Sequence, residues 1–163
     1  MLLRFAVSNF KSFSDRAELS MQKTKSMESE SHYIETEHGK YLKAAAIFGA
    51  NASGKSNFIK ALEYSLKVIR TPRSKPSPVP VFKLRSDYQN VPTTFEFDVL
   101  VDNKKYWYAF SLLKGFVKDE QLQRIDKNGN EVKIFSRDGQ SFSFESDDLT
   151  IDENNLFPQL AKI

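Results

Sequence analysis

The sequence of 163 residues contains no cysteine. Disulfides, thiolate metal ligands and cysteine nucleophiles are therefore excluded for this chain, and a reducing cytoplasm is compatible with it. No apolar run approaches the ~20 residues that a membrane-spanning helix needs. Residues 1–13 hold only short apolar runs broken by polar side chains, so they do not form a secretory signal. We expect a cytoplasmic protein that does not enter a membrane.

A marked excess of one charge is also missing, since 24 basic and 21 acidic side chains give a net charge of +3. The basic residues are spread out, whereas binding to a phosphate backbone requires clustered Lys and Arg. The charge pattern therefore favours an ordinary solvated surface over a nucleic-acid patch. Hydrophobic residues make up 40% of the chain and include fourteen Phe, which is enough to form the core of one domain, with or without a small appended lobe.

The first forty residues predict two strands followed by a loop. Apolar and polar residues alternate over residues 2–10, which is typical of a strand, and a second short strand is expected at residues 17–21. Residues 22–40 are polar and lack helical periodicity, so we expect a surface loop. His32 and His38 lie among glutamates in this segment, but without strict ligand spacing, so a solvated loop is favoured over a metal site.

A short apolar run at residues 41–48 ends at Gly49 and predicts a strand buried on both faces of a sheet. The segment after residue 56 predicts an amphipathic helix, because its apolar residues share one stripe with a period of 3.6. Thr71-Pro72 is expected to end the helix, since proline restricts the residue before it. The stripe consists of Phe58, Leu62, Ser65, Leu66 and Ile69.

The segment between this strand and this helix matches the full pattern of a phosphate-binding loop. Glycines let backbone N–H groups turn toward phosphates, and the helix N-terminus behind them favours anions. In this pattern Lys55 reaches the β and γ phosphates, and the Ser56 hydroxyl coordinates Mg²⁺. The sequence therefore predicts ATP and Mg²⁺ as ligands and Lys55 as the catalytic residue. A turn without a ligand would not require Lys and Ser together here. The loop reads Gly49-Ala50-Asn51-Ala52-Ser53-Gly54-Lys55-Ser56.

The second half of the chain predicts antiparallel β structure. Residues 95–101 and 106–112 alternate on both sides of Asp102-Asn103 and read as a hairpin, with a third strand at residues 117–125. Asn128-Gly129 predicts a tight turn in which both central residues need positive φ, and Asp138-Gly139 marks another turn. The run Tyr106-Trp107-Tyr108 could stack on bases, but its alternation favours core packing. Nearby basic residues are typical of a wet surface, namely Lys83, Arg85, Lys104 and Lys105.

These patterns divide the chain into four parts. Residues 1–70 are expected to form a nucleotide-binding core, residues 71–92 a connection with four of the six prolines, and residues 93–147 an antiparallel β meander. From residue 148 the pattern predicts the start of a helix, which Asn154-Asn155 could cap. The chain stops inside this pattern, so we expect it to be shorter than a natural domain. The prolines of the connection are Pro72, Pro76, Pro78 and Pro80, and the apolar residues of the helix are Leu156, Phe157, Leu160 and Ile163.

Two segments resemble the ABC-type ATPase heads of the SMC and RecF-like group. More closely, they look like the bacterial AAA-family ATPases related to OLD proteins, which are often found in phage-defence operons. Such heads open with a strand that ends in Asn-Phe-Lys/Arg-Ser, here Asn9-Phe10-Lys11-Ser12, and their loop reads Gly-x-Asn-x-Ser-Gly-Lys-Ser-Asn, here residues 49–57. The β-rich insertion around Glu120 and Leu122 and the segment 155–161 are similar to these heads in a less specific way.

The resemblance implies an α/β fold, the N-terminal lobe of an ABC-ATPase-like P-loop NTPase with a β-rich antiparallel insertion. It implies that Lys11 approaches the phosphates, although a solvated turn lysine is an equal alternative. Asn51 and Asn57 would join the binding loop, and Asn51 also suits left-handed turn geometry. The intact protein would be a homodimer whose heads sandwich two ATP molecules and hydrolyse them with Mg²⁺. DNA or an effector nuclease would be its partner, in DNA-related or anti-phage activity.

Several parts of such a head are missing from this sequence. No apolar strand ends in Asp-Glu, so there is no Walker B motif, and there is no Leu-Ser-Gly-Gly-like signature. Gln121 and Gln123 are candidates for a γ-phosphate sensor by position alone, and exposed strand residues are favoured. We therefore expect this chain alone to bind ATP weakly and to hydrolyse it negligibly. One alternative is another P-loop class, but the sequence shows neither the acceptor site and lid of a kinase nor the guanine-recognition motif of a GTPase. The other alternative is a non-enzymatic module that binds nucleic acid or a partner.

Overall fold

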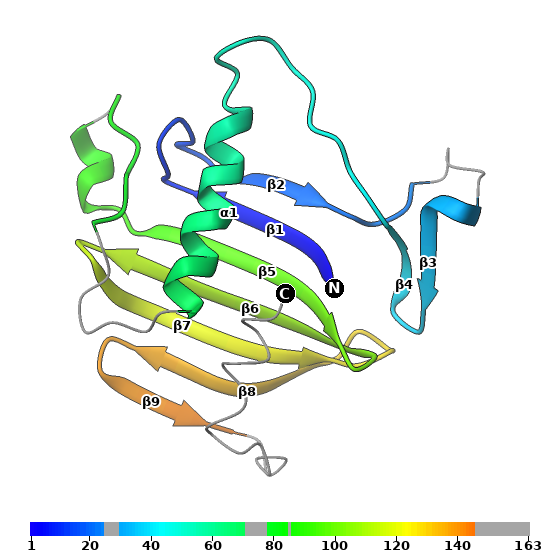
Figure 1. The fold of residues 1–163 in the computed structure, drawn as a ribbon. Coiled ribbons are helices and arrows are strands. Elements are labelled where there is room, and N and C mark those ends of the chain that lie inside the picture. Colours follow the sequence, from blue (N-terminus) through cyan, green and yellow to red (C-terminus); the bar gives the residue numbers. More distant parts are fainter. Residues whose placement is uncertain (25–29, 71–77, 85, 146–163) are drawn as a thin grey trace.

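The fold is a single antiparallel sheet of seven strands with one long helix packed on one face (Figure 1). The computed structural model describes residues 1–24, 30–70, 78–84 and 86–145. The strand order is β2-β1-β5-β6-β7-β8-β9, and a separate pair, β3-β4, lies beside the sheet. The sheet strands are β1 (Leu2–Ser8), β2 (Ala17–Ser20), β5 (Thr93–Val101), β6 (Lys104–Leu113), β7 (Phe116–Ile125), β8 (Glu131–Asp138) and β9 (Ser141–Phe144). The remaining elements are η1 (Glu30–His32), β3 (Tyr33–Thr36), β4 (Gly39–Leu42), α1 (Lys55–Arg70) and η2 (Ser86–Asn90).

The core lies between α1 and the sheet, and aromatic rings form most of its centre. Phe5 of β1 contacts Phe58 of α1 edge to face at 5.4 Å and Phe97 of β5 at 5.1 Å, measured between ring centroids. Phe95 of β5 stacks on Tyr64 of α1 at 5.9 Å. Aromatic side chains bury large areas, and paired rings add directional contacts. The helix is therefore held to the sheet mainly by phenylalanine packing.

Several predicted elements are confirmed. The hairpin predicted around Asp102 and Asn103 is β5-β6, and both turn residues have positive φ, at 49° and 60°. The predicted helix is α1, which begins at Lys55, so the last two residues of the predicted loop already belong to its first turn, and it ends at Arg70. Of the predicted stripe, Phe58, Ser65 and Ile69 are buried together with Ala61, while Leu62 and Leu66 are half-buried.

The turn between β7 and β8 differs from the predicted one. Gly129 has a φ of 85°, but Asn128 does not adopt positive φ. The connection is longer than a two-residue turn, and Asp126 organises it: its Oδ1 accepts hydrogen bonds from the backbone N–H groups of Asn128 and Asn130, both at 2.8 Å. A side chain that bonds to its own turn replaces the left-handed residue that a two-residue turn would need.

The loop predicted at residues 22–40 is wrong for its second half, which forms η1 and the β3-β4 hairpin. Thr36 closes the hairpin turn, since its hydroxyl donates to the Gly39 carbonyl at 2.9 Å and accepts from the His38 N–H at 3.1 Å. Gly39 has a φ of 123°, a conformation that suits glycine. The polar composition predicted a loop, but the hydrogen bonds of the Thr36 side chain and the positive φ of Gly39 stabilise a hairpin turn.

The buried strand predicted at residues 41–48 is also wrong. Only Tyr41 and Leu42 belong to a strand, β4, and residues 44–50 have no regular structure and are exposed. Phe48 is 89% exposed. Figure 1 shows this segment running from β4 to α1 without joining either sheet. Among the described residues no strand lies beside it, so its backbone has no ladder partner and its apolar side chains have no covering layer.

Some predictions fall on parts of the chain that lie outside the described residues. These are the helix stop at Thr71-Pro72, Pro76, Arg85 and the helix expected from residue 148, including Asn154-Asn155. Within the described ranges, no helix is both long and apolar enough to cross a membrane.

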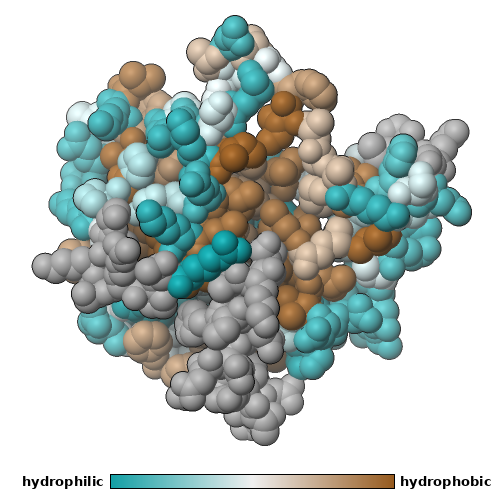
Figure 2. Space-filling model, viewed as in Figure 1, coloured by the Kyte–Doolittle hydropathy of each residue, from teal (hydrophilic) through white to brown (hydrophobic). Residues whose placement is uncertain are grey.

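An apolar cleft lies between the C-terminal half of α1 and the sheet, away from the predicted phosphate loop. Figure 2 shows apolar side chains gathered near the middle of the face that α1 covers, with polar side chains toward the edges. The cleft is lined by Leu2, Leu62, Leu66, Ile69, Phe97, Val99 and Tyr108. Because this lining lacks charged groups, the cleft does not suit a triphosphate.

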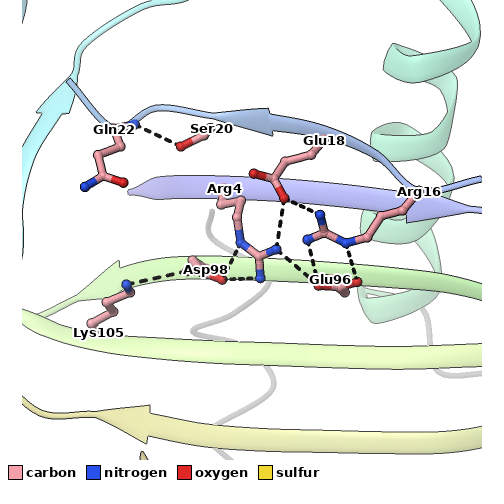
Figure 3. A network of polar contacts seen from close by, with 8 residues as sticks. All are labelled: Arg4, Arg16, Glu18, Ser20, Gln22, Glu96, Asp98 and Lys105. Atoms are coloured by element: carbon pink, nitrogen blue, oxygen red, sulfur yellow. Dashed lines mark hydrogen bonds and ion pairs between the residues drawn. The ribbon is translucent and has the colours of Figure 1, made fainter. Parts of the chain in front are cut away.

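The other face of the sheet carries an ion-pair network (Figure 3). Arg4 of β1 donates to Asp98 at 2.8 Å and to Glu96 at 3.2 Å, both on β5. Arg16, just before β2, bonds to Glu96 at 2.9 Å and also pairs with Glu18. The hydrogen bond from Arg16 lowers the pKa of Glu96 and, likewise, that of Glu18. The network joins the N-terminal strands to the meander on the face opposite α1.

This network predicts a loss of stability in acid. The pKa of Glu96 is lower in the folded chain than its ordinary value of 4.5. The contribution of Glu96 to the free energy of unfolding is therefore complete above pH 4.5 and is lost as pH falls through the folded pKa. We expect Glu96→Gln to lower the free energy of unfolding at pH 7 by about 1 to 2 kcal/mol. The acid-induced fall in stability, measured by urea unfolding from about pH 6 to pH 3, should be shallower in this variant.

The matched control is Glu37→Gln, since Glu37 is exposed and forms no ion pair among the residues that the structure describes. Its unfolding curves should follow those of the unchanged chain at every pH. Identical pH profiles for Glu96→Gln and the unchanged chain would show that the network does not contribute to acid sensitivity.

Candidate functional site

The loop at residues 49–54 leads directly into α1, and its backbone turns before the helix begins. The Ser53 N–H donates to the Ala50 carbonyl at 3.3 Å, and the Asn57 and Phe58 N–H groups donate to the Gly54 carbonyl at 2.8 and 3.0 Å. Gly54 therefore stands at the start of the helix. The first turn of α1 contains no acidic residue, so no carboxylate competes for the N–H groups at the helix N-terminus.

Two glycines keep the inside of this loop open. A Cβ at Gly49 would lie 2.9 Å from Ser53 Oγ, which is too close for a carbon atom. A Cβ at Gly54 would lie 3.2 Å from Ser12 Oγ and 3.3 Å from Phe13 Cζ, and its φ of 98° is strained for other residues. Side chains at either position would fill the space around which the loop folds.

Lys55 lies across this loop. Its Nζ donates to the carbonyls of Gly49 and Ala50 at 2.7 and 2.6 Å and lies 3.4 Å from Ser53 Oγ. The ammonium group is thus held at the mouth of the loop by two of the loop's own backbone carbonyls. Ser56 follows it in the first helical turn with an exposed side chain. The structure brings the predicted lysine and the backbone of the loop together.

A turn after β1, which we call the N-terminal turn (residues 9–14), packs against the loop. The Asn57 side chain donates to Ser12 Oγ at 3.0 Å. Phe13 lies edge to face on Phe58 at 6.0 Å, and both Ser12 and Phe13 approach Gly54. These contacts join residues more than forty positions apart in the sequence. The motif predicts the loop but not this neighbour, for which Asn9-Phe10-Lys11-Ser12 is the only sequence signal.

Lys11 and Asn51 were predicted to assist the loop. Lys11 lies in the N-terminal turn with a φ of 50°, and its N–H donates to the Pro80 carbonyl at 2.7 Å. Among the described residues no hydrogen bond joins its side chain to the loop. Ala52, with a φ of 64°, is a left-handed residue of the loop and Asn51 is not, so the alternative explanation of Asn51 as a left-handed turn residue is wrong.

These residues fit a triphosphate with Mg²⁺. The fit rests on the space that a Cβ would fill at Gly49 and Gly54, on the ammonium of Lys55 at the mouth of the loop and on a helix N-terminus without carboxylates. Backbone N–H groups and one lysine are the donors that phosphate oxygens need, and a serine hydroxyl is a suitable ligand for Mg²⁺.

The other candidate residues do not join this site. Gln121 and Gln123 pair with Ala109 and Trp107, which places them on the face of the sheet opposite α1. Trp107 shares that face, while Tyr108 is buried in the core. Within the described residues no group of three or more histidines and carboxylates could hold a metal ion.

Comparison with known protein families identifies a family to which this sequence is similar. The sequence model of a family described as "AAA domain, putative AbiEii toxin, Type IV TA system" matches residues 44–160, which is more than half of the chain. The matched residues begin just before the phosphate loop and include α1 and the meander β5-β9. Among curated proteins, none matches the chain.

Proposed function

The chain belongs to this family of AAA domains, and we propose that residues 49–57 bind the triphosphate of ATP together with Mg²⁺. Membership indicates a nucleotide-binding, ATPase-like domain, and the mixed α/β structure with a mostly antiparallel sheet fits a P-loop NTPase. The observation that carries the proposal is the position of Lys55 Nζ across a glycine loop at the start of α1.

Each residue of the loop has a distinct role in this proposal. Gly49 and Gly54 keep the loop open, and backbone N–H groups between residues 50 and 56, other than that of Ser53, bind the phosphates. Lys55 contacts the β and γ phosphates and stabilises the charge that develops on the γ-phosphate during hydrolysis. The Ser56 hydroxyl holds Mg²⁺, which neutralises phosphate charge when it is bound. Ser12 and Asn57 hold the N-terminal turn against the loop, so that Lys11 can approach the phosphates.

For the intact protein we propose an ABC/SMC-like ATPase, in which two copies of the head sandwich two ATP molecules. The support is the opening element at Asn9-Phe10-Lys11-Ser12 together with the extended loop pattern that ends in Asn57. The Walker B carboxylate and the signature motif are not found in this sequence. The proposed physiological setting is a DNA-related or anti-phage activity in the cytoplasm, with DNA or an effector nuclease as partner, and the family description includes a toxin–antitoxin system.

A titration of this chain with ATP, with and without Mg²⁺, tests the proposal. We expect weak saturable binding that Mg²⁺ strengthens and a rate of phosphate release equal to that without protein. Ser56→Ala should lower the affinity about tenfold in Mg²⁺, the effect of losing about 1.4 kcal/mol, and should change it little without Mg²⁺. The control is Ser143→Ala, an exposed serine on the edge strand β9, which should leave both affinities unchanged.

Two outcomes would each contradict one part of this proposal. Steady ATP turnover by this chain that Lys55→Ala abolishes would overturn the expectation that this chain alone hydrolyses ATP negligibly, and would leave the assignment of the loop in place. Salt-dependent DNA binding combined with no response to ATP would favour the non-enzymatic module, because phosphate-backbone contacts alone make binding depend strongly on salt.

A further inference from the structure

Asn9, which does not belong to the phosphate loop, is almost completely buried at 1% exposure and directly follows β1 with a φ of 51°. Its side chain makes three hydrogen bonds to backbone groups more than seventy positions away, in residues 78–84 and 86–93. Nδ2 donates to the carbonyls of Tyr88 and Val91 at 2.9 and 2.7 Å, and Oδ1 accepts the N–H of Phe82 at 3.0 Å. Both N–H donors of the amide and its oxygen are thus bonded to backbone groups of Phe82, Tyr88 and Val91.

The backbone of Asn9 adds two further bonds. Its carbonyl accepts the hydroxyl of the buried Thr93 at 2.7 Å, and its N–H donates to the Ser14 carbonyl at 3.2 Å, across the N-terminal turn. Phe10 and Phe13 exchange a pair of backbone hydrogen bonds inside this turn, at 2.9 and 2.8 Å. Asn9 therefore closes the turn by its backbone bond to Ser14, and it joins the turn to Phe82, Tyr88, Val91 and Thr93 by its other bonds.

The same turn contacts the phosphate loop at its other end. Ser12 Oγ accepts a hydrogen bond from the Asn57 side chain, and a Cβ at Gly54 would lie tightly against Ser12 Oγ and Phe13 Cζ, at 3.2 and 3.3 Å. Lys11 also has left-handed backbone geometry, which is costly for a lysine and persists only when the surrounding structure holds it. The bonds of Asn9 and the bond from the Lys11 N–H to Pro80 provide this restraint.

We infer that Asn9 is a positioning residue for nucleotide binding, which acts by fixing the N-terminal turn, and with it Lys11 and Ser12, beside the phosphate loop. This inference rests on the proposed function, and it explains why an asparagine rather than another polar residue begins the turn. An aspartate could accept from Phe82 but could not donate to the two carbonyls, and an alanine would leave all three backbone groups unpaired.

The test measures Mg·ATP affinity of the full chain in two backgrounds. Asn9→Gly removes the three side-chain bonds and keeps a residue that tolerates the positive φ. We expect it to lower affinity about tenfold, within the usual range of couplings between a supporting residue and a ligand site. In a chain that already carries Lys11→Ala and Ser12→Ala, the same Asn9→Gly change should alter affinity less than about twofold. If Asn9 acts through these two side chains, its replacement has no further effect once they are gone.

The control is Tyr108→Phe, which removes one buried hydrogen bond, from Tyr108 of β6 to Glu120 of β7 at 2.6 Å. It should destabilise the chain without changing affinity. Thr93→Val removes only the bond to the Asn9 carbonyl and should weaken binding in the same direction by a smaller factor. If Asn9→Gly does not fold, Thr93→Val replaces it in both backgrounds.

A second readout comes from hydrogen exchange. If Asn9 couples the turn to the loop, then Mg·ATP should slow exchange of the Phe82 and Lys11 amide hydrogens, because coupling between two sites acts in both directions. An equal effect of Asn9→Gly in both backgrounds, or no effect on affinity in a folded chain, would overturn the inference. If Lys55→Ala also leaves affinity unchanged, the proposed function itself fails; if Lys55→Ala abolishes binding, only the role of Asn9 fails.

Discussion

Replacing Lys55 by alanine is expected to lower the affinity for Mg·ATP at least about a hundredfold, or about 2.7 kcal/mol. The ammonium group bonds to the Gly49 and Ala50 carbonyls, at the mouth of the loop. There it can turn to a phosphate without moving the backbone. Hydrogen bonds between charged groups are about twice as strong as hydrogen bonds between neutral groups. A lysine that bonds to the charged phosphates of ATP therefore contributes more than an ordinary hydrogen bond. Isothermal calorimetry or a competition assay with a fluorescent nucleotide would measure the loss.

The matched control is Lys60→Ala, which removes the same charge from an exposed position on α1. Its affinity should stay within about twofold of the unchanged chain, because an exposed charge away from the ligand is screened by salt. A second check compares the affinities for ATP and AMP. Because AMP lacks the β and γ phosphates that Lys55 contacts, Lys55→Ala should hardly change the affinity for AMP. Equal losses for both lysine variants would indicate a general effect of net charge rather than a contact in the loop.

Replacing Phe58 by alanine is expected to lower the free energy of unfolding by about 3 to 5 kcal/mol, the usual cost of deleting a core phenylalanine. Phe58 is 7% exposed and meets Phe5 of β1 and Phe13 of the N-terminal turn edge to face, at 5.4 and 6.0 Å. Its loss leaves a cavity under the first turn of α1, between the sheet and the phosphate loop. Chemical denaturation followed by circular dichroism would measure the effect.

Ile59→Ala provides the control on the same helix turn, because Ile59 is 54% exposed. It removes a similar apolar side chain next in sequence and should cost less than about 1 kcal/mol. A small and equal effect of both substitutions would mean that α1 does not pack on the sheet through Phe58. Because Phe13 lies on the same ring, Phe58→Ala should also weaken ATP binding, whereas Ile59→Ala should not.

The elements that the sequence predicted well are those with local signals. The β5-β6 hairpin depends on alternation over nine or ten residues and on Asp102-Asn103, both readable within one window. The helix α1 depends on one apolar stripe and on the loop before it. The network on the opposite face was not foreseen, because Arg4 and Glu96 are separated by 92 positions and meet only through the β1-β5 register.

The strand predicted at residues 41–48 shows where local signals fail. Its apolar composition is typical of a buried strand, but a strand also needs neighbours that accept its backbone hydrogen bonds, and these lie elsewhere in sequence. The described residues provide no neighbour for Ile47 and Phe48, so the segment is exposed. Polar composition misled in the opposite direction at β3-β4, where Thr36 and Gly39 close a hairpin.

For the candidate site, the motif predicted the loop at residues 49–56 and the position of Lys55 within it. Asn9, Ser12 and Phe13 belong to the N-terminal segment that carries the family resemblance, but the sequence did not predict their contacts with the rest of the chain. Those contacts depend on tertiary bonds to Phe82, Asn57 and Phe58, which no local pattern encodes. The division of the chain into a core, a connection and a meander stays a prediction, although β1 pairs with β5 and so joins both parts in one sheet.

The most direct test of the account is a titration of the isotopically labelled chain with Mg·ATP, followed by the chemical shifts of its backbone amides. If residues 49–56 bind the triphosphate, the largest changes should occur at the amides of residues 50–56 and at Ser12 in the neighbouring turn, and adenosine should not reproduce them. Changes confined to the apolar cleft around Leu62 and Leu66, or no change up to millimolar ATP, would contradict the central claim that this loop is a triphosphate site.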